Sequence, residues 1–379
     1  MTSTLLLSPS TKTAHPLAKA PTSASKLLVP NGLPDTATPN LTSLLAFLED
    51  KAHWVNEYAT TVPTIPGKNK ANPNLAQAVL AALTSARFCR RKPAEQAPLL
   101  ATIQAAIDAQ QPIPLTLIHG PLKNRNNVEY QHPDWAEWFT YCQLHRVGCA
   151  VKQLYAPGLS ITLLLDDARS EAANGMAPSI CDDYRLALTR FITDAGFGGL
   201  IQHIESLRPV YEAPSWAVHV EQATDIIDSW WHDTAHATRK EVFRLHAERN
   251  SYGLEALNDE QLHQETLAAA YRYCVAFTAE QLAGVWNRPE TLTFLYNDYA
   301  GYAQLYTLRR GSISQPWQGK GAVSWDTTAK RWDPTLLTQG KYSQTPSVCK
   351  TPATELMPVA LKTLPLPKSL AFIPVLTNA

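Results

Sequence analysis

The chain has 379 residues, of which 45% are hydrophobic, enough to bury one large core or two smaller ones. Its 33 basic and 33 acidic residues cancel, so no net charge favours binding to nucleic acid or to an anionic membrane surface. No segment approaches the roughly 18 uninterrupted apolar residues of a membrane helix, and the N-terminus lacks the charged region of a secretory signal. We therefore expect no nucleic-acid or membrane partner and, with the cysteine usage described below, a cytoplasmic protein; composition leaves its oligomeric state open.

Helical and strand patterns alternate along the first half of the chain. Apolar residues at helical spacing predict helices at 41–58, 74–87, 94–110, 133–147 and 177–193. Short apolar runs bounded by Pro and Gly predict strands at 114–118, 151–155 and 159–165. This alternation predicts an α/β fold, with a Rossmann-like, largely parallel sheet and flanking helices.

Three further regions complete the predicted organisation. Residues 1–38 are rich in Ser, Thr and Pro and are expected to be disordered or loosely packed. Residues 39–340 form one α/β domain, and a nearly continuous helical pattern places an added helical block at 221–300. Residues 341–379 contain too many prolines for a helix and predict an extended tail that lies on the body.

A basic, amide-rich segment follows the strand predicted at 114–118. His119 ends the apolar run, and Lys123, Arg125 and Asn126 come directly after a Gly-Pro turn. Ligands of open α/β sheets bind outside the carboxyl ends of strands, and lysine and arginine are the residues that hold phosphate there. The segment therefore indicates an anion site, and a solvated polar loop is the competing interpretation.

Two other segments carry charged residues at positions where they could contact a ligand. Asp166 and Asp167 follow the strand predicted at 159–165, where a carboxylate can bind an amine, act as a base, or simply cap the turn. Arg309, Arg310 and Lys320 surround small residues much later in the chain, which fits either a second anion contact or an exposed loop.

Metal-binding patterns are weak. The six cysteines include no CxxC pair, which favours buried reduced thiols over zinc or disulfides. His232 and His236 are four residues apart, and Glu241, His246 and Glu248 follow, but the glutamate of the zinc-protease motif is missing. We expect no metal, and keep a metal-dependent (non-haem iron) oxidase or oxygenase built on these residues as an alternative.

Taken together, these segments resemble the pyoverdine/dityrosine-biosynthesis family, which contains the isocyanide (isonitrile) synthases. The matching positions lie within about residues 95–195 and 305–325: Pro112-Ile113, Pro121, Lys123, Asn126, Pro133-Asp134, Ala136-Glu137, Tyr155, Pro157-Gly158, Ile161, Asp166, Arg310, Ser312 and Ile313. The chain departs from the family pattern at three places. Asn124-Arg125 replaces a usual Ser-Pro, Leu165-Asp166-Asp167 replaces Ser-Asp-Gly, and Ser314 replaces a histidine, which indicates a divergent member.

The resemblance implies a synthase of a specialised metabolite that converts an amino acid amine to an isonitrile. Ribulose 5-phosphate is the implied carbon donor and co-substrate, with no metal or nicotinamide cofactor. By charge and position we assign substrate binding to Lys123, Arg125, Asn126, Arg310, Ser312 and Lys320, and catalysis to Asp166, His119 and Tyr155. Asp166 would bind the ammonium or transfer protons, and His119 or Tyr155 would act as an acid.

A non-catalytic family member that retains the fold is the remaining alternative, and the sequence does not identify the amino acid. If the basic segment binds the sugar phosphate, Lys123→Ala should weaken that binding by about 1.5–3 kcal/mol. Because a lysine in a loop adds no core area, the same substitution is expected to leave folding intact.

Overall fold

The structure, a computed structural model, describes residues 41–62, 74–123, 132–296, 301–337 and 354–376. All of these lie in one unit, Asn40–Ala379. The N-terminal segment predicted at 1–38 lies outside the described residues. Within them, every helix is too short or too polar to cross a membrane.

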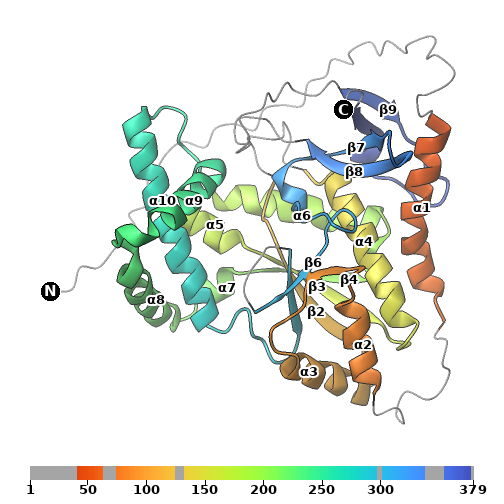
Figure 1. The fold of residues 1–379 in the computed structure, drawn as a ribbon, viewed down its shortest axis with the longest axis horizontal. Helices are drawn as coiled ribbons and strands as arrows, with labels where there is room; N and C mark the ends of the chain where they lie inside the picture. The colour runs from red at the N-terminus through yellow and green to blue at the C-terminus, as the bar shows by residue number, and fades with distance from the viewer. Residues whose placement is uncertain (1–40, 63–73, 124–131, 297–300, 338–353, 377–379) are drawn as a thin grey trace. The chain divides into compact units, whose positions relative to one another are not determined.

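A six-stranded sheet forms the centre of this unit, in the order β1-β6-β5-β2-β3-β4 (Figure 1). All neighbouring pairs are parallel except β1 with β6. The strands span Cys89–Arg91 (β1), Ile113–His119 (β2), Leu159–Leu165 (β3), Ile201–Ser206 (β4), Leu292–Leu295 (β5) and Ala303–Leu305 (β6). The prediction of a largely parallel sheet is confirmed.

Ten α-helices connect and flank the strands of this part of the chain. They span Leu41–Thr60 (α1), Leu75–Leu83 (α2), Ala97–Asp108 (α3), Trp135–Lys152 (α4), Asp167–Asn174 (α5), Pro178–Asp194 (α6), Arg208–Tyr211 (α7), Trp216–Trp231 (α8), Ala237–Asn250 (α9) and Asp259–Leu282 (α10). Short 3-10 turns at Phe197–Gly199 (η1), Thr234–His236 (η2), Pro316–Gln318 (η3) and Lys368–Leu370 (η5) complete the helical elements described.

Helix α4 is the most buried of the described helices, because α1, the central sheet and a second sheet all pack around it (Figure 1). Asp134 begins it with a capping box: its carboxylate accepts from the Ala136 amide at 2.8 Å, and the Glu137 carboxylate accepts from the Asp134 amide at 2.9 Å. Reciprocal caps of this kind fix where a helix starts. The position of Glu137 is thereby set before any longer-range contact is considered.

The second sheet has four strands, in the order β8-β7-β10-β9. They span Lys320–Asp326 (β7), Arg331–Leu337 (β8), Thr354–Pro358 (β9) and Phe372–Leu376 (β10). Part of the predicted tail thus forms strands, and β10 runs parallel to β7. The Trp135 indole donates to the Phe372 carbonyl at 2.8 Å, which ties this sheet to the start of α4.

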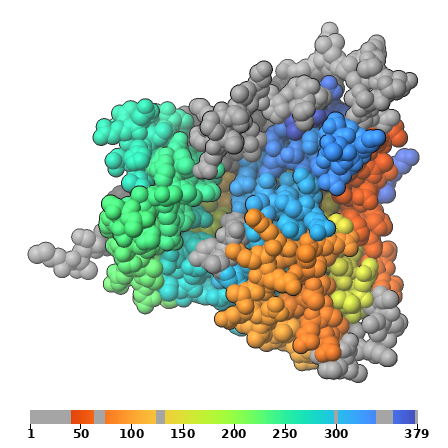
Figure 2. Space-filling view, viewed as in Figure 1, coloured from red at the N-terminus to blue at the C-terminus, as the bar shows by residue number. Residues whose placement is uncertain are grey.

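Helices α8, α9 and α10 form the block coloured green and teal in Figure 2. It has a small apolar cluster of its own, centred on Ala223, Ile227, Trp231 and Ala269. A buried ion pair between Arg169 of α5 and Glu280 of α10, at 2.7 Å, joins the block to the carboxyl edge of the central sheet.

The structure differs from the predicted elements in two places. Residues 151–155, expected as a strand, are the last turn of α4 and the bend that follows it. Strand β5 lies within the block at 221–300 that was expected to be helical. The five described cysteines are buried and unpaired, as predicted.

Candidate functional site

The carboxyl edge of the central sheet contains a topological switch point. The chain runs from β2 to β3 and β4 on one side, then returns to β5 on the other side of β2. Ligands of open α/β sheets bind at such a point, because the loops leaving the two strands diverge there. His119 ends β2, Asp166 follows β3 and Tyr296 follows β5, so all three lie at this edge.

His119 is completely buried, and its burial lowers its pKa from 6.5 to about 4. Its Nδ1 lies 2.8 Å from the Gly120 carbonyl, which can only accept, so Nδ1 carries the proton of the neutral ring. Nε2 is then an acceptor, and the Tyr141 hydroxyl lies 3.0 Å away to donate to it. In this state His119 orients Tyr141, and its one N–H is bonded to the Gly120 carbonyl rather than directed at a substrate.

Trp317 packs against His119 at the switch point, and Tyr296 packs against Trp317. The Trp317 ring lies 4.8 Å from the imidazole and 6.1 Å from the Tyr296 ring, measured between centroids. A Cβ on Gly120 would lie 2.6 Å from the indole, so only glycine lets Trp317 approach this closely. The Tyr296 hydroxyl is buried and has no hydrogen-bond partner among the described residues.

Asp166 lies beside His119, and its amide donates to the His119 carbonyl at 3.1 Å. One carboxylate oxygen, Oδ2, pairs with Arg169, whereas the other, Oδ1, is buried without a partner in the described part of the chain. Burial raises the pKa of Asp166, and the Arg169 guanidinium opposes that rise. A buried acceptor without a donor is costly, so Asp166 Oδ1 is an atom whose hydrogen bonding a polar ligand would complete.

Arg169 holds Asp166 in position. Its guanidinium also pairs with Glu280 and lies over the rings of Tyr273, Phe277 and Trp286, at 5.2 to 5.7 Å from their centroids. Burial raises the pKa of Glu280 to about 7. Arg169 therefore holds the Asp166 carboxylate while its own guanidinium is held by Glu280 and by the three aromatic rings.

Asp167 has a structural role. Its Oδ1 accepts from the Leu207 amide at 2.9 Å, and its Oδ2 accepts from the Ser206 hydroxyl at 2.6 Å. These bonds join the start of α5 to the end of β4. Of the two adjacent carboxylates, Asp166 is the one that has an oxygen without a hydrogen-bond partner in the described residues.

Lys123 does not lie in a solvated loop; its side chain is completely buried. The ammonium lies 2.7 Å from Glu137 and 3.1 Å from Asp134, and it donates to the carbonyls of Pro316 and Gly319 at 2.8 and 3.0 Å. The ammonium group therefore makes these four contacts with groups of the protein itself. The geometry favours a structural role, joining the end of β2 to α4 and to the segment before β7, over direct contact with a phosphate.

The other predicted residues are Arg125 with Asn126, then Tyr155, and finally the residues of the late basic segment. Arg125 and Asn126 lie outside the described residues. Tyr155 lies near the amino ends of β2 and β3, with its hydroxyl bonded to the carbonyls of Ala106 and Gln111, so the structure does not bring it to the switch point.

The late basic segment follows β6 at the carboxyl edge. Arg310 is exposed in the turn after this strand, and Ser312 closes the turn through the Thr307 hydroxyl at 3.1 Å. Lys320 is exposed at the start of β7. Lys123 therefore contacts this segment through the carbonyls of Pro316 and Gly319. The side chains of Arg310 and Lys320 are exposed and remain available to a ligand.

The histidines of the helical block do not form a metal site. His232 ends α8 with an exposed side chain, and His236 lies in η2 against Trp230. No group of three or more His, Cys, Asp or Glu side chains in the described residues is placed to hold a metal ion. The alternative based on a histidine-rich helix therefore lacks its ligand set.

Sequence reasoning missed Tyr296, Trp317 and the Arg169–Glu280 pair. Tyr296 follows an apolar run, LTFL, that was included in the helical block although Pro289 precedes it. A short run of Leu, Thr, Phe and Leu that follows a proline is a strand signal, and it could have placed Tyr296 at a strand end. Nothing local in the sequence points to Trp317 or Glu280.

Comparisons with known proteins agree with this architecture. A family model described as pyoverdine/dityrosine biosynthesis protein matches residues 103–292, half of the chain. The chain belongs to this family. The match spans β2 to β5 and so includes His119 and Asp166. Membership supports a role as a biosynthetic enzyme of specialised metabolism.

One solved structure, that of PvcA, extends the likeness in fold. PvcA from Pseudomonas aeruginosa superposes with a TM-score of 0.60 at 16% identity, covering 80% of this chain and 99% of that protein. AlbC, a cyclodipeptide synthase from Streptomyces noursei, gives a TM-score of 0.28 at 14% identity over 49% of this chain and 82% of its own. A search of curated protein sequences found no match. The PvcA fold therefore continues beyond the segment that the family model covers.

Proposed function

We propose that this family member is an isonitrile synthase, which converts the amine of an amino acid to an isonitrile with ribulose 5-phosphate as the carbon donor. Family membership supports a biosynthetic enzyme, and the resemblance of the sequence to the isonitrile synthases implies the class of reaction. The observation that carries the proposal is Asp166 Oδ1, a buried oxygen at the switch point without a partner in the described part of the chain. This oxygen is an acceptor, which suits an amine.

Asp166 would first bind the ammonium of the amino acid and then remove a proton from it. The amine must lose a proton before it can attack the ketone of the sugar, and a carboxylate whose pKa is raised by burial is a better base than an exposed one. Arg169 holds the carboxylate in place for this step. Attack on the ketone and loss of water then form the imine from which the isonitrile carbon derives.

Tyr296 would donate its hydroxyl proton in a hydrogen bond to the ketone oxygen, where negative charge develops as nitrogen attacks. His119 would act through Tyr141, which it orients, rather than as the acid itself. Arg310 and Lys320, with Arg125, Asn126 and Ser312, remain the proposed contacts of the sugar phosphate. Lys123 would support them by holding the carbonyls of Pro316 and Gly319.

Incubation of the purified protein with ribulose 5-phosphate and each proteinogenic amino acid, followed by mass spectrometry, tests the proposal. One amino acid is expected to yield an N≡C product. Absence of any such product across the whole set would reject the proposal and favour a non-catalytic family member.

Two variants connect the product to this site. Asp166→Asn should lower kcat by 100-fold or more, on the order of general-base effects. Tyr296→Phe should lower it as well while leaving the free energy of unfolding within about 0.5 kcal/mol of wild type, because the hydroxyl has no partner to lose. A Tyr296→Phe enzyme with wild-type turnover would remove this residue from the mechanism.

A further inference from the structure

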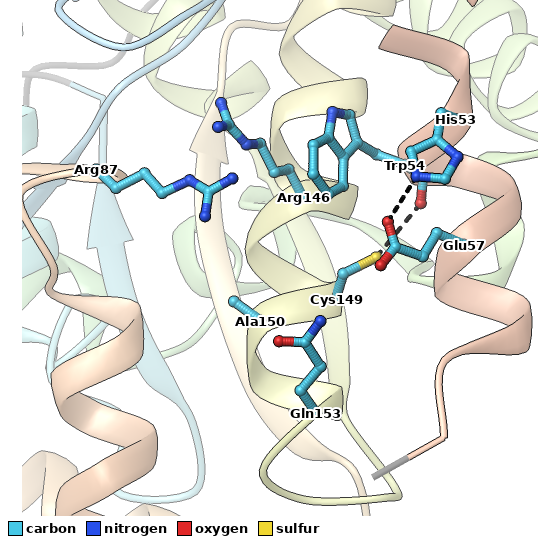
Figure 3. A pocket seen from close by; sticks show the side chains of 8 residues that line it. All are labelled: His53, Trp54, Glu57, Arg87, Arg146, Cys149, Ala150 and Gln153. Carbon is cyan, nitrogen blue, oxygen red and sulfur yellow. Dashed lines mark hydrogen bonds and ion pairs between the residues drawn. The ribbon is translucent and has the colours of Figure 1, made fainter. Parts of the chain in front are cut away.

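A pocket of about 290 Å³ lies between α1, α4 and the segment between α2 and β1 (Figure 3). It shares no lining residue with the switch point. Its lining residues are His53, Trp54, Glu57, Arg87, Arg146, Cys149, Ala150 and Gln153.

Two arginines dominate the charge of this pocket. Arg87 and Arg146 come from different elements, and their guanidinium groups lie on the same side of the pocket in Figure 3. Both lie near one indole, that of Trp54, with guanidinium carbons 5.8 and 5.1 Å from the ring. Neither forms an ion pair with a carboxylate among the residues that the structure describes, and Arg146 Nε is buried there without a hydrogen-bond partner.

The surroundings leave this positive charge uncompensated. The one carboxylate in the lining, Glu57, accepts from His53 at 3.0 Å on the far side of the pocket. Asp50, the acidic group that acts on Arg146, pairs with Lys51 at 3.2 Å. Burial and the neighbouring Arg87 charge both lower the pKa of Arg146. Like charges in a partly desolvated pocket repel each other, and an anion bound between them would offset that repulsion.

We propose that this pocket is a second binding site, for a small phosphate-bearing molecule held by Arg87 and Arg146. Two planar guanidinium groups offer paired donors that match phosphate oxygens. A phosphate ester carries nearly two negative charges at pH 7, which two arginines neutralise, whereas a carboxylate carries one. Gln153 and the Glu57 carboxylate can bond hydroxyl groups on the remainder of the ligand, and the volume suits a molecule the size of a small sugar phosphate.

The site would be separate from catalysis but linked to it through α4. Arg146 and Cys149 lie on the same helix as Tyr141 and Glu137, which contact His119 and Lys123. Cys149 Sγ also donates to the Trp54 carbonyl at 3.5 Å, which connects the pocket wall to α1. A ligand here would act on a helix that both sites share.

Calorimetric titration with inorganic phosphate at constant ionic strength tests the proposal, using wild type, Arg87→Gln and Arg146→Gln. Each substitution should weaken phosphate binding at least tenfold. Arg190→Gln, an exposed arginine on α6, is the matched control and should change affinity less than twofold. Arg310→Gln should leave this binding event intact, which distinguishes it from binding at the switch point.

Thermal unfolding gives a second readout that does not depend on activity. Phosphate should raise the Tm of wild type and of Arg190→Gln but not that of Arg87→Gln. In phosphate-free buffer, Arg87→Gln should unfold at the wild-type temperature or above it, because one of two repelling charges has gone. Wild-type phosphate affinity in both pocket variants, or an equal loss in the Arg190→Gln control, would overturn the proposal.

Discussion

Lys123→Met tests whether the buried lysine is structural. Methionine keeps the length of the side chain but removes the ammonium, and with it two carboxylate contacts and two carbonyl contacts at 2.7 to 3.1 Å. Glu137 is then a buried carboxylate without a cation, and breaking such a pair typically costs about 3–5 kcal/mol. The two carbonyls add to this cost only in part, since buried networks are not additive.

Urea denaturation followed by circular dichroism at pH 8 measures the effect. The free energy of unfolding should fall by about 3–5 kcal/mol, whereas Lys92→Met, an exposed lysine, should change it by less than about 0.5 kcal/mol. Adding Glu137→Gln to Lys123→Met should recover part of the loss, because no buried charge then remains.

The difference in the free energy of unfolding between wild type and Lys123→Met should also become smaller as the pH falls. Burial already raises the pKa of Glu137 to about 7 while Lys123 opposes the rise, so removing the lysine raises it further. Between pH 8 and pH 5 the folded Lys123→Met variant therefore gains stability as Glu137 becomes protonated, and wild type gains less over the same range. A loss below about 1 kcal/mol at pH 8, or one that is independent of pH, would show that Lys123 is not a structural ion partner.

The remaining predictions concern packing and titration. Gly321→Ala should prevent folding or lower the free energy of unfolding by more than about 3 kcal/mol, because a Cβ there would lie 2.1 Å from the Ala136 amide; a soluble variant with wild-type Tm would contradict this packing. Burial raises the pKa of Glu280 from 4.5 to about 7, so the folded state keeps a proton that the unfolded chain releases within that range. This contribution to stability is present at low pH and is lost as the pH rises through 7. The stability of wild type relative to Glu280→Gln should therefore fall between pH 5 and pH 8, and a flat or rising difference in chemical denaturation would disprove the assignment.

Local signals were enough to predict the scaffold around the site. The predicted helix at 133–147 follows from Asp134 and an apolar face, and the capping box with Glu137 confirms its start. The strand predicted at 114–118 is β2, bounded by proline and glycine. Strand β5 was missed because a run as short as Leu292–Leu295 has no period that separates a buried strand from a buried helix.

The site itself depends on contacts that no local pattern carries. Lys123 stands in a polar, amide-rich segment and was expected to bind the sugar phosphate, with a solvated loop as the alternative, yet its partner Gly319 lies 196 residues away. His119 was expected to act as an acid, but the aromatic residues that bury it come from α4, α6 and η3. Burial and charge at these positions are properties of the assembled sheet, not of the segment.

The pairing of β10 with β7, and of the Trp135 indole with the Phe372 carbonyl, has a consequence for biogenesis. During synthesis the N-terminal half of α4 emerges long before its last neighbours exist, with several large aromatic side chains exposed. Contacts of such long sequence separation form late and slowly. We expect nascent chains that stop before residue 372 to bind chaperones or aggregate, and the carboxyl edge of the central sheet to become ordered only when β10 has been made.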